Sequence, residues 1–128
     1  MRCAWMLAPE QPGCGNVSTR YCLTLDLRND PASIAAYKRF HQKIWPEITE
    51  SIKSAGVLDM EIYLIGTRLF MIMEVDDSFS FAKKAEADRK NPEVQEWEKL
   101  MWTFQQALPD AKQGEKWRLM ERIYKLEP

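Results

Sequence analysis

The sequence predicts an α+β fold of the ferredoxin-like, split-βαβ kind, and three patterns along the chain support this prediction. Apolar residues alternate with polar ones over residues 21–28, which is the period of a strand with one buried face. Apolar residues then recur every three or four positions over residues 34–52, as on a helix. A strand hairpin, a second helical region and a last strand follow, which completes the order β-α-β-β-α-β of an antiparallel sheet with helices on one face.

The first predicted strand runs from about Arg20 to Arg28 and ends at a turn that contains proline. Asp30 is a suitable helix N-cap, and Pro31 suits the first helical position, where an N–H donor has no partner. The helix is expected to reach about Ala55, with a kink or a restart at Pro46, because proline removes a helical N–H. Its inward stripe comprises Ile34, Tyr37, His41, Ile44 or Trp45, Ile48 and Ile52.

Two strand-like runs, Met60 to Ile65 and Leu69 to Val75, are separated by Gly66-Thr67-Arg68 and predict a hairpin. The second run is apolar on both faces, so it needs cover on both sides. Helices would cover one face. In so short a chain a second copy is the expected cover for the other face, which predicts a homodimer.

A second helical region is predicted beyond the hairpin. A helical stretch over residues 80–88 precedes Asn91-Pro92, which signals the start of another helix, and Pro109 is expected to end it. A final strand is expected over residues 117–126. The lysines near residues 83–84 and 112–118 are expected on solvated surfaces. The apolar stripe of the later helix comprises Val94, Trp97, Met101, Phe104 and Leu108.

Composition indicates one globular domain and a small uncharged ligand. The chain has 128 residues, of which 45% are hydrophobic and 29% charged, so one domain over residues 19–128 can enclose its own core. Residues 1–18 lack any periodic pattern and are expected to form a flexible tail. A net charge of -1 argues against nucleic acid and anionic membrane surfaces as partners.

The cysteines and the hydropathy pattern place the protein in the cytoplasm. Cys3, Cys14 and Cys22 are odd in number and form no Cys/His cluster, so neither a disulfide framework nor a metal site is predicted. A reducing compartment fits best. The apolar stretch from Cys3 to Ala8 is shorter than the apolar region of a signal peptide, and no run elsewhere approaches the roughly 20 residues of a membrane span, so neither is expected.

His41 is the only histidine of the chain, and it follows Tyr37 by one helical turn on an apolar face. The imidazole and the phenol should therefore point into the same space and could line a polar pocket. The alternative is a core histidine bonded to a backbone carbonyl beside a core tyrosine, and spacing alone favours that alternative. Trp97 is similarly either a core residue or the wall of a ligand site.

The segment from Tyr37 through His41 to Trp45-Pro46-Glu47 resembles the L-rhamnose mutarotase family, whose first helix has Tyr, His four residues later, and then Trp-Pro-Glu. The resemblance extends from about Thr19 to Leu126, through Ala55-Gly56, the strand at residues 61–64, Leu69-Phe70 and the segment from Asn91-Pro92 to Trp97. It implies a dimeric α/β barrel without a cofactor. It also implies that His41 is the catalytic acid/base and that Tyr37 and Trp97 contact the sugar.

The chemistry that this resemblance implies suits a sparse site. Exchange of anomers needs the anomeric hydroxyl to lose a proton and the ring oxygen to gain one, after which the open aldehyde closes on its other face. An imidazole that titrates near neutrality can do both. No metal or nucleotide is needed, in keeping with the lack of any such motif in the sequence.

Two departures from the family pattern concern the substrate. Met60 occupies a position where rhamnose mutarotases usually have tyrosine, and Glu98 follows Trp97 where they usually have a second tryptophan. Both losses would change the bonding of sugar hydroxyls, and the runs at residues 59–64 and 69–74 resemble family members assigned to L-fucose. L-fucose is therefore the preferred substrate prediction, with L-rhamnose as the alternative. Methionine at position 60 could also simply repack a core position.

Two other classes of function remain open. A dimeric ferredoxin-like monooxygenase or haem-degrading protein could share this fold, because fold does not fix function. A sugar-binding module without catalysis is the other alternative.

Overall fold

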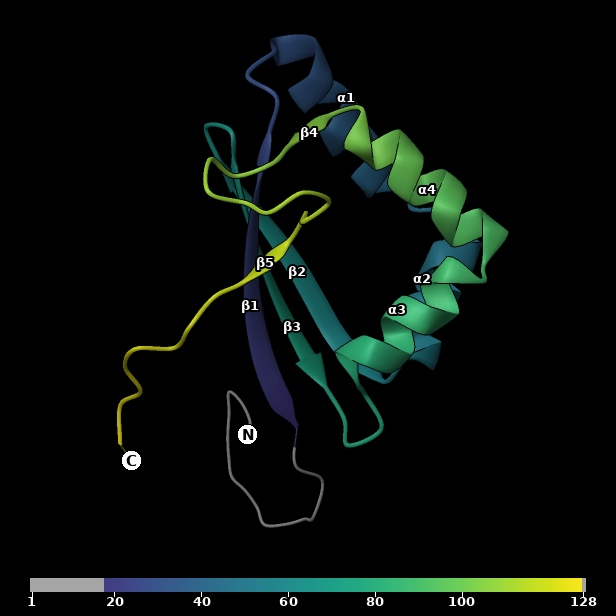
Figure 1. Ribbon diagram of the computed structural model, residues 1–128, viewed down its shortest axis with the longest axis vertical. Helices are drawn as coiled ribbons and strands as arrows, with labels where there is room; N and C mark the ends of the chain where they lie inside the picture. Colours follow the sequence, from purple (N-terminus) through teal and green to yellow (C-terminus); the bar gives the residue numbers. More distant parts are fainter. Residues whose placement is uncertain (1–17, 128) are drawn as a thin grey trace.

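The computed structural model describes residues 18–127, in which four helices lie on one side of an antiparallel sheet (Figure 1). The predicted α+β class is confirmed, with two helices at each helical position of the β-α-β-β-α-β order. The predicted tail of residues 1–18, except for its last residue, lies outside the described part of the chain. In chain order the elements are β1 (Thr19–Leu27), α1 (Pro31–Gln42), α2 (Pro46–Ser54), β2 (Val57–Ile65), β3 (Arg68–Val75), α3 (Phe81–Arg89), α4 (Pro92–Trp102), β4 (Gln105–Gln106) and β5 (Arg118–Leu119).

The sheet has the strand order β2-β3-β1-β4, and β5 also pairs with β1. The register places Met71 of β3 opposite both Leu23 of β1 and Ile62 of β2, so these three side chains share one face. That face is covered by the helices and holds the core. Leu25, Leu27 and Leu69 are its fully buried side chains.

The break in the first helical region falls where proline predicts it. Helix α1 ends at Gln42, and α2 begins at Pro46. The N-cap prediction is also confirmed, because the Asp30 side chain accepts a hydrogen bond from the Ser33 N–H at 3.1 Å. After α2 the chain turns at Gly56, where φ is +99° and an added Cβ would lie 2.5 Å from an Asp76 carboxylate oxygen.

The later helix is shorter than predicted. Helix α4 starts at Pro92 as expected but ends at Trp102, so Phe104 and Leu108 are not helical. The Thr103 hydroxyl donates to the Leu100 carbonyl at 2.6 Å, and the next residues leave the helix to form β4. There the Arg28 N–H donates to the Phe104 carbonyl at 2.8 Å. The pairing of β4 with the open edge of β1 therefore takes the place of the two further helical turns that were predicted up to Leu108.

The predicted strand over residues 117–126 is also wrong, because only Arg118 and Leu119 pair with β1. The Met120 N–H still donates to the Cys22 carbonyl at 2.7 Å. Beyond it, residues 121–127 have no strand partner within the described chain and are exposed. Three apolar side chains of this segment, Ile123, Tyr124 and Leu126, are at least 72% exposed.

The sheet face that points away from the helices is also partly apolar. The alternation along β1 and β3 places Cys22, Phe70 and Ile72 on this face, and all three are half-buried. On β2 the same face presents Tyr63 and Ile65, which are 54% and 81% exposed. No helix of residues 18–127 is long and apolar enough to cross a membrane.

Candidate active site

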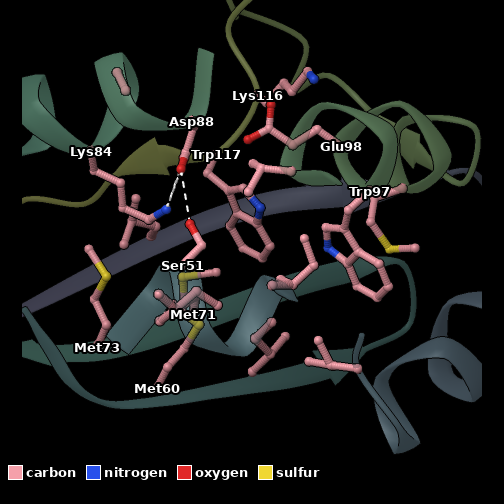
Figure 2. A pocket seen from close by; sticks show the side chains of 18 of the residues that line it. Ser51, Met60, Met71, Met73, Lys84, Asp88, Trp97, Glu98, Lys116 and Trp117 are labelled. Carbon is pink, nitrogen blue, oxygen red and sulfur yellow. Dashed lines mark hydrogen bonds and ion pairs between the residues drawn. The ribbon is translucent and has the colours of Figure 1, made fainter. Parts of the chain in front are cut away.

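A cavity of about 380 Å³ lies between the inner face of the sheet and the helices. This size is within the range of small-molecule sites. Strands β1, β2 and β3 and all four helices contribute to its walls, and most lining side chains are apolar or aromatic. Figure 2 shows it from close by. The four residues that the sequence singled out for the site, Tyr37, His41, Met60 and Trp97, all line this one cavity.

His41 is held in place by the backbone of its own helix. Its Nδ1 lies 2.8 Å from the carbonyl oxygen of Tyr37. A carbonyl only accepts hydrogen bonds, so Nδ1 has the proton and donates it. In the neutral ring the other nitrogen, Nε2, then has a free lone pair, which is the form of a general base.

Burial keeps that imidazole neutral. It lowers the pKa of His41 below its ordinary value of 6.5, and the bond to the Tyr37 carbonyl opposes this only in part. The ring is packed between aromatic neighbours, with centroid distances of 4.2 Å to Tyr37 and 5.7 Å to Trp97. At neutral pH the histidine is therefore a base in a fixed orientation.

Tyr37 is 4% exposed, and its hydroxyl is the polar end of a buried aromatic side chain. The Gln105 amide nitrogen lies 3.5 Å from this hydroxyl and donates to it. Burial raises the pKa of Tyr37 to about 12, so the group stays a neutral phenol that can donate a hydrogen bond into the cavity. Gln105 also lines the cavity and is 4% exposed. The sequence interpretation missed it, because its position was assigned to a helix.

Trp97 both packs in the core and lines the cavity. It is 8% exposed and packs edge-on against Trp45 at 5.1 Å between ring centroids, as a core residue does. It also lines the cavity beside His41. Met60 is half-buried on β2 opposite Met73, and Figure 2 shows both near Met71 on the floor of the cavity.

A polar group on α2 and α3 was not predicted from the sequence. The Lys84 ammonium lies 2.9 Å from both carboxylate oxygens of Asp88, and the Ser51 hydroxyl donates to Asp88 at 3.4 Å. All three line the cavity. The expectation that Lys84 lies on a solvated surface is wrong, because its side chain is only 21% exposed. An i,i+4 pair of opposite charge was the available signal, but it is common on solvated helices.

Two more charged residues lie on the cavity wall. Glu98 of α4 is half-buried, which raises the pKa of its carboxyl, while the nearby Lys116 acts against that shift. Lys116 and Trp117 come from the segment before β5, which was also predicted to be solvated. Figure 2 shows Glu98 and Lys116 above Trp97.

A second hollow of about 560 Å³, which we call the outer hollow, shares part of its lining with the first. Ser51, Lys84 and Asp88 line both spaces, so they form the shared wall. Lys83 lines only the outer hollow. Within residues 18–127 no three side chains of His, Cys, Asp or Glu are grouped to hold a metal ion.

Comparison with known proteins gives a consistent family. A sequence model described as L-rhamnose mutarotase matches residues 20–126. A protein named L-fucose mutarotase from Xanthomonas campestris pv. campestris is 46% identical over 109 residues, which cover 84% of this chain and 87% of that protein.

Two solved structures share the fold. The crystal structure of an L-rhamnose mutarotase from Formosa agariphila superposes with a TM-score of 0.63 at 23% identity, covering 85% of this chain and 99% of the other. Tetracenomycin F2 cyclase from Streptomyces glaucescens, a polyketide cyclase, gives 0.58 at 20% identity, with coverage of 86% and 98%. At these identities the likeness concerns the fold alone.

Proposed function

Because this chain belongs to the L-rhamnose mutarotase family, whose members are isomerases, we propose that it interconverts the anomers of L-fucose with His41 as acid and base. One observation carries the proposal. The only histidine lies on the wall of a cavity of suitable size, and its Nδ1–H bond to a carbonyl leaves Nε2 able to accept a proton. The 46% identity to a protein named L-fucose mutarotase supports the choice of sugar.

The proposed reaction uses His41 Nε2 twice. It first takes the proton of the anomeric hydroxyl, as C1 and that oxygen form a carbonyl and the bond from C1 to the ring oxygen breaks. The protonated imidazole then gives its proton to the ring oxygen, which becomes a hydroxyl. Both oxygens are bonded to C1, so one nitrogen can reach both with a small movement. Rotation about the C1–C2 bond and closure by the reverse steps give the other anomer.

Tyr37 and Trp97 orient the sugar in this proposal. The Tyr37 phenol is neutral and already accepts a bond from Gln105, which leaves its own proton for a sugar oxygen. The Trp97 ring lies beside His41, where an indole face can cover the C–H face of the sugar. Met60 on β2 supplies an apolar surface to the cavity, where the family resemblance implies a tyrosine for the rhamnose type, and this difference favours a different pattern of hydroxyls.

The test is anomer-exchange NMR on equilibrated L-fucose and L-rhamnose at equal enzyme concentration. We expect exchange of both above the spontaneous rate, with L-fucose faster. A clear excess for L-rhamnose would overturn the substrate. Saturable sugar binding without exchange would instead identify a non-catalytic sugar-binding module, and absence of both would reject the proposal altogether.

We also propose that the active form is a cytoplasmic homodimer closed through the outer sheet face. The alternation along β3 supports this, because Phe70 and Ile72 lie on the face that no described helix covers. Light scattering should give about twice the chain mass of 15.0 kDa. Ile72→Asp should give monomers, whereas Tyr63→Asp nearer the edge should weaken the dimer less. A wild-type protein that is monomeric and fully active would contradict the dimer.

A further inference from the structure

The ion pair on the cavity wall is unusual for its burial and its position. The side chains of Lys84 and Asp88 are 21% and 15% exposed, and each lines the same cavity as His41. Ser51 of the neighbouring helix donates to Asp88, so the pair is held from α2 as well as within α3. Surface i,i+4 pairs normally extend into solvent. This pair instead presents an ammonium and a carboxylate to a cavity whose lining is mostly apolar or aromatic.

The charged pair and Trp97, a ring neighbour of His41, lie on different sides of the cavity. Figure 2 shows Lys84 and Asp88 on one side and Trp97 on the other, with Trp117 between them. The Trp97 ring is 5.7 Å from that of His41, so Trp97 marks the histidine end. A ligand whose reacting carbon is at His41 therefore extends its opposite side toward Lys84 and Asp88.

In a pyranose ring C4 lies across from C1. A hydroxyl at C4 can donate to a carboxylate and accept from an ammonium at the same time, and hydrogen bonds to charged groups are stronger than those between neutral groups. We propose that Lys84 and Asp88 bind the C4 hydroxyl of the sugar and select its configuration, in which L-fucose and L-rhamnose differ. This inference rests on the proposed function, because it assumes that C1 lies at His41.

The test compares Lys84→Met and Asp88→Asn with Lys83→Met. Lys83 is the matched control, because it is adjacent on α3 and lines the outer hollow but not the cavity. For L-fucose we expect each of the two cavity variants to raise KM about tenfold to a hundredfold, with kcat within about threefold of wild type. The preference for L-fucose over L-rhamnose should fall by a similar factor, and Lys83→Met should change neither value.

The 4-deoxy analogue of L-fucose separates binding from a structural role. It lacks the hydroxyl in question, so wild type and Lys84→Met should exchange its anomers with the same KM. Variants that lose thermal stability but keep the KM for L-fucose would show that the pair only stabilises α3, and would overturn the inference. So would an equal loss on the 4-deoxy sugar. A rise in KM for Lys83→Met would place the sugar in the outer hollow and also overturn it.

These outcomes differ from failure of the proposed function. If wild type exchanges no anomers, the proposed function fails before any variant is compared. If wild type exchanges L-fucose and the variants Lys84→Met and Asp88→Asn behave like the control Lys83→Met, the proposed function stands. The role of Lys84 and Asp88 is then rejected.

Discussion

The two ends of the cavity are built in different ways. At the histidine end, the contacts of His41 and Tyr37 are with aromatic rings and the neutral amide of Gln105, from α1, α4 and β4. The other end, named the recognition end for the role proposed above, has a half-buried ion pair from α3, supported by Ser51 of α2. Surroundings of low polarity exclude water, which could otherwise take the transferred proton. Charged groups form stronger hydrogen bonds and therefore suit the recognition of sugar hydroxyls of a given configuration. The difference suggests that reaction and recognition are separated along the cavity.

The largest effect should come from His41→Gln. Glutamine keeps a side chain of similar polarity but cannot exchange a proton near neutrality, so we expect kcat to fall about a hundredfold to ten-thousandfold. NMR exchange rates measure this, and tryptophan fluorescence can check that L-fucose still binds. Near-full exchange by the folded variant would remove the distinction between the two ends, since the reaction would then not depend on this histidine.

Tyr37→Phe should have the next largest effect. It removes one hydroxyl, leaves the ring in the core and deprives the Gln105 amide of an acceptor. We expect kcat/KM for L-fucose to fall about fivefold to a hundredfold, the range for one lost bond to a buried partner. Gln105→Leu is the companion variant, because it removes the amide that donates to the Tyr37 hydroxyl. A loss of kcat/KM of the same size there would indicate that the orientation of the tyrosine, held by this bond, is what matters. An unchanged rate in both would exclude the phenol from the site.

The pH dependence of kcat/KM should report on the histidine end in the unmodified enzyme. Burial places the pKa of His41 below 6.5, and only its neutral form accepts a proton. The value of kcat/KM should therefore be constant near neutrality and fall in acid, with its inflection below 6.5. The residual rate of His41→Gln should lack this limb. An inflection above 6.5 would contradict a neutral, buried imidazole.

The same shift predicts a change in stability. A histidine whose pKa is lower in the folded state binds a proton more readily when unfolded. The free energy of unfolding should then decline as the pH falls from about 6.5 toward the folded pKa of His41, and this contribution should be complete above that window. Urea unfolding of wild type and His41→Gln at several pH values measures this decline in the free energy of unfolding. The part that His41 contributes should be absent in the variant.

Met60→Tyr should have the smallest effect. It introduces the phenol that the family resemblance implies for the rhamnose type at this position on β2, and the half-buried Met60 lines the cavity. We expect the ratio of L-rhamnose to L-fucose exchange to rise a few-fold, with little change in stability. If Met60 only packs against its neighbours, the ratio will not move, and the recognition end will be the sole determinant of the substrate.

The histidine end was predictable from the sequence because its residues lie on periodic helix faces. Tyr37 and His41 are one turn apart, and Trp97 lies on the stripe of α4. The break at Pro46 and the hairpin were predictable for similar local reasons.

The recognition end was not predictable in this way. Asp88 and Ser51 are 37 positions apart in the chain and meet only when α3 packs beside α2. Helix α3 has no buried residue, so it lacks the apolar stripe that predicts which side of a helix faces inward. Gln105 was missed for a further reason, since the open edge of β1 ended α4 earlier than its apolar pattern suggested.

The interruption at Pro46 has an electrostatic consequence for the reaction. Because α1 ends at Gln42, His41 lies in its last turn, where the aligned peptide dipoles concentrate partial negative charge. That charge favours a positive imidazolium by about 0.3–1 kcal/mol, and more where water is excluded. In the mechanism proposed above it would therefore stabilise the protonated ring between the two proton transfers, against the burial that lowers the pKa of His41. An uninterrupted helix from residue 31 to 54 would place its terminus away from the histidine and remove this support.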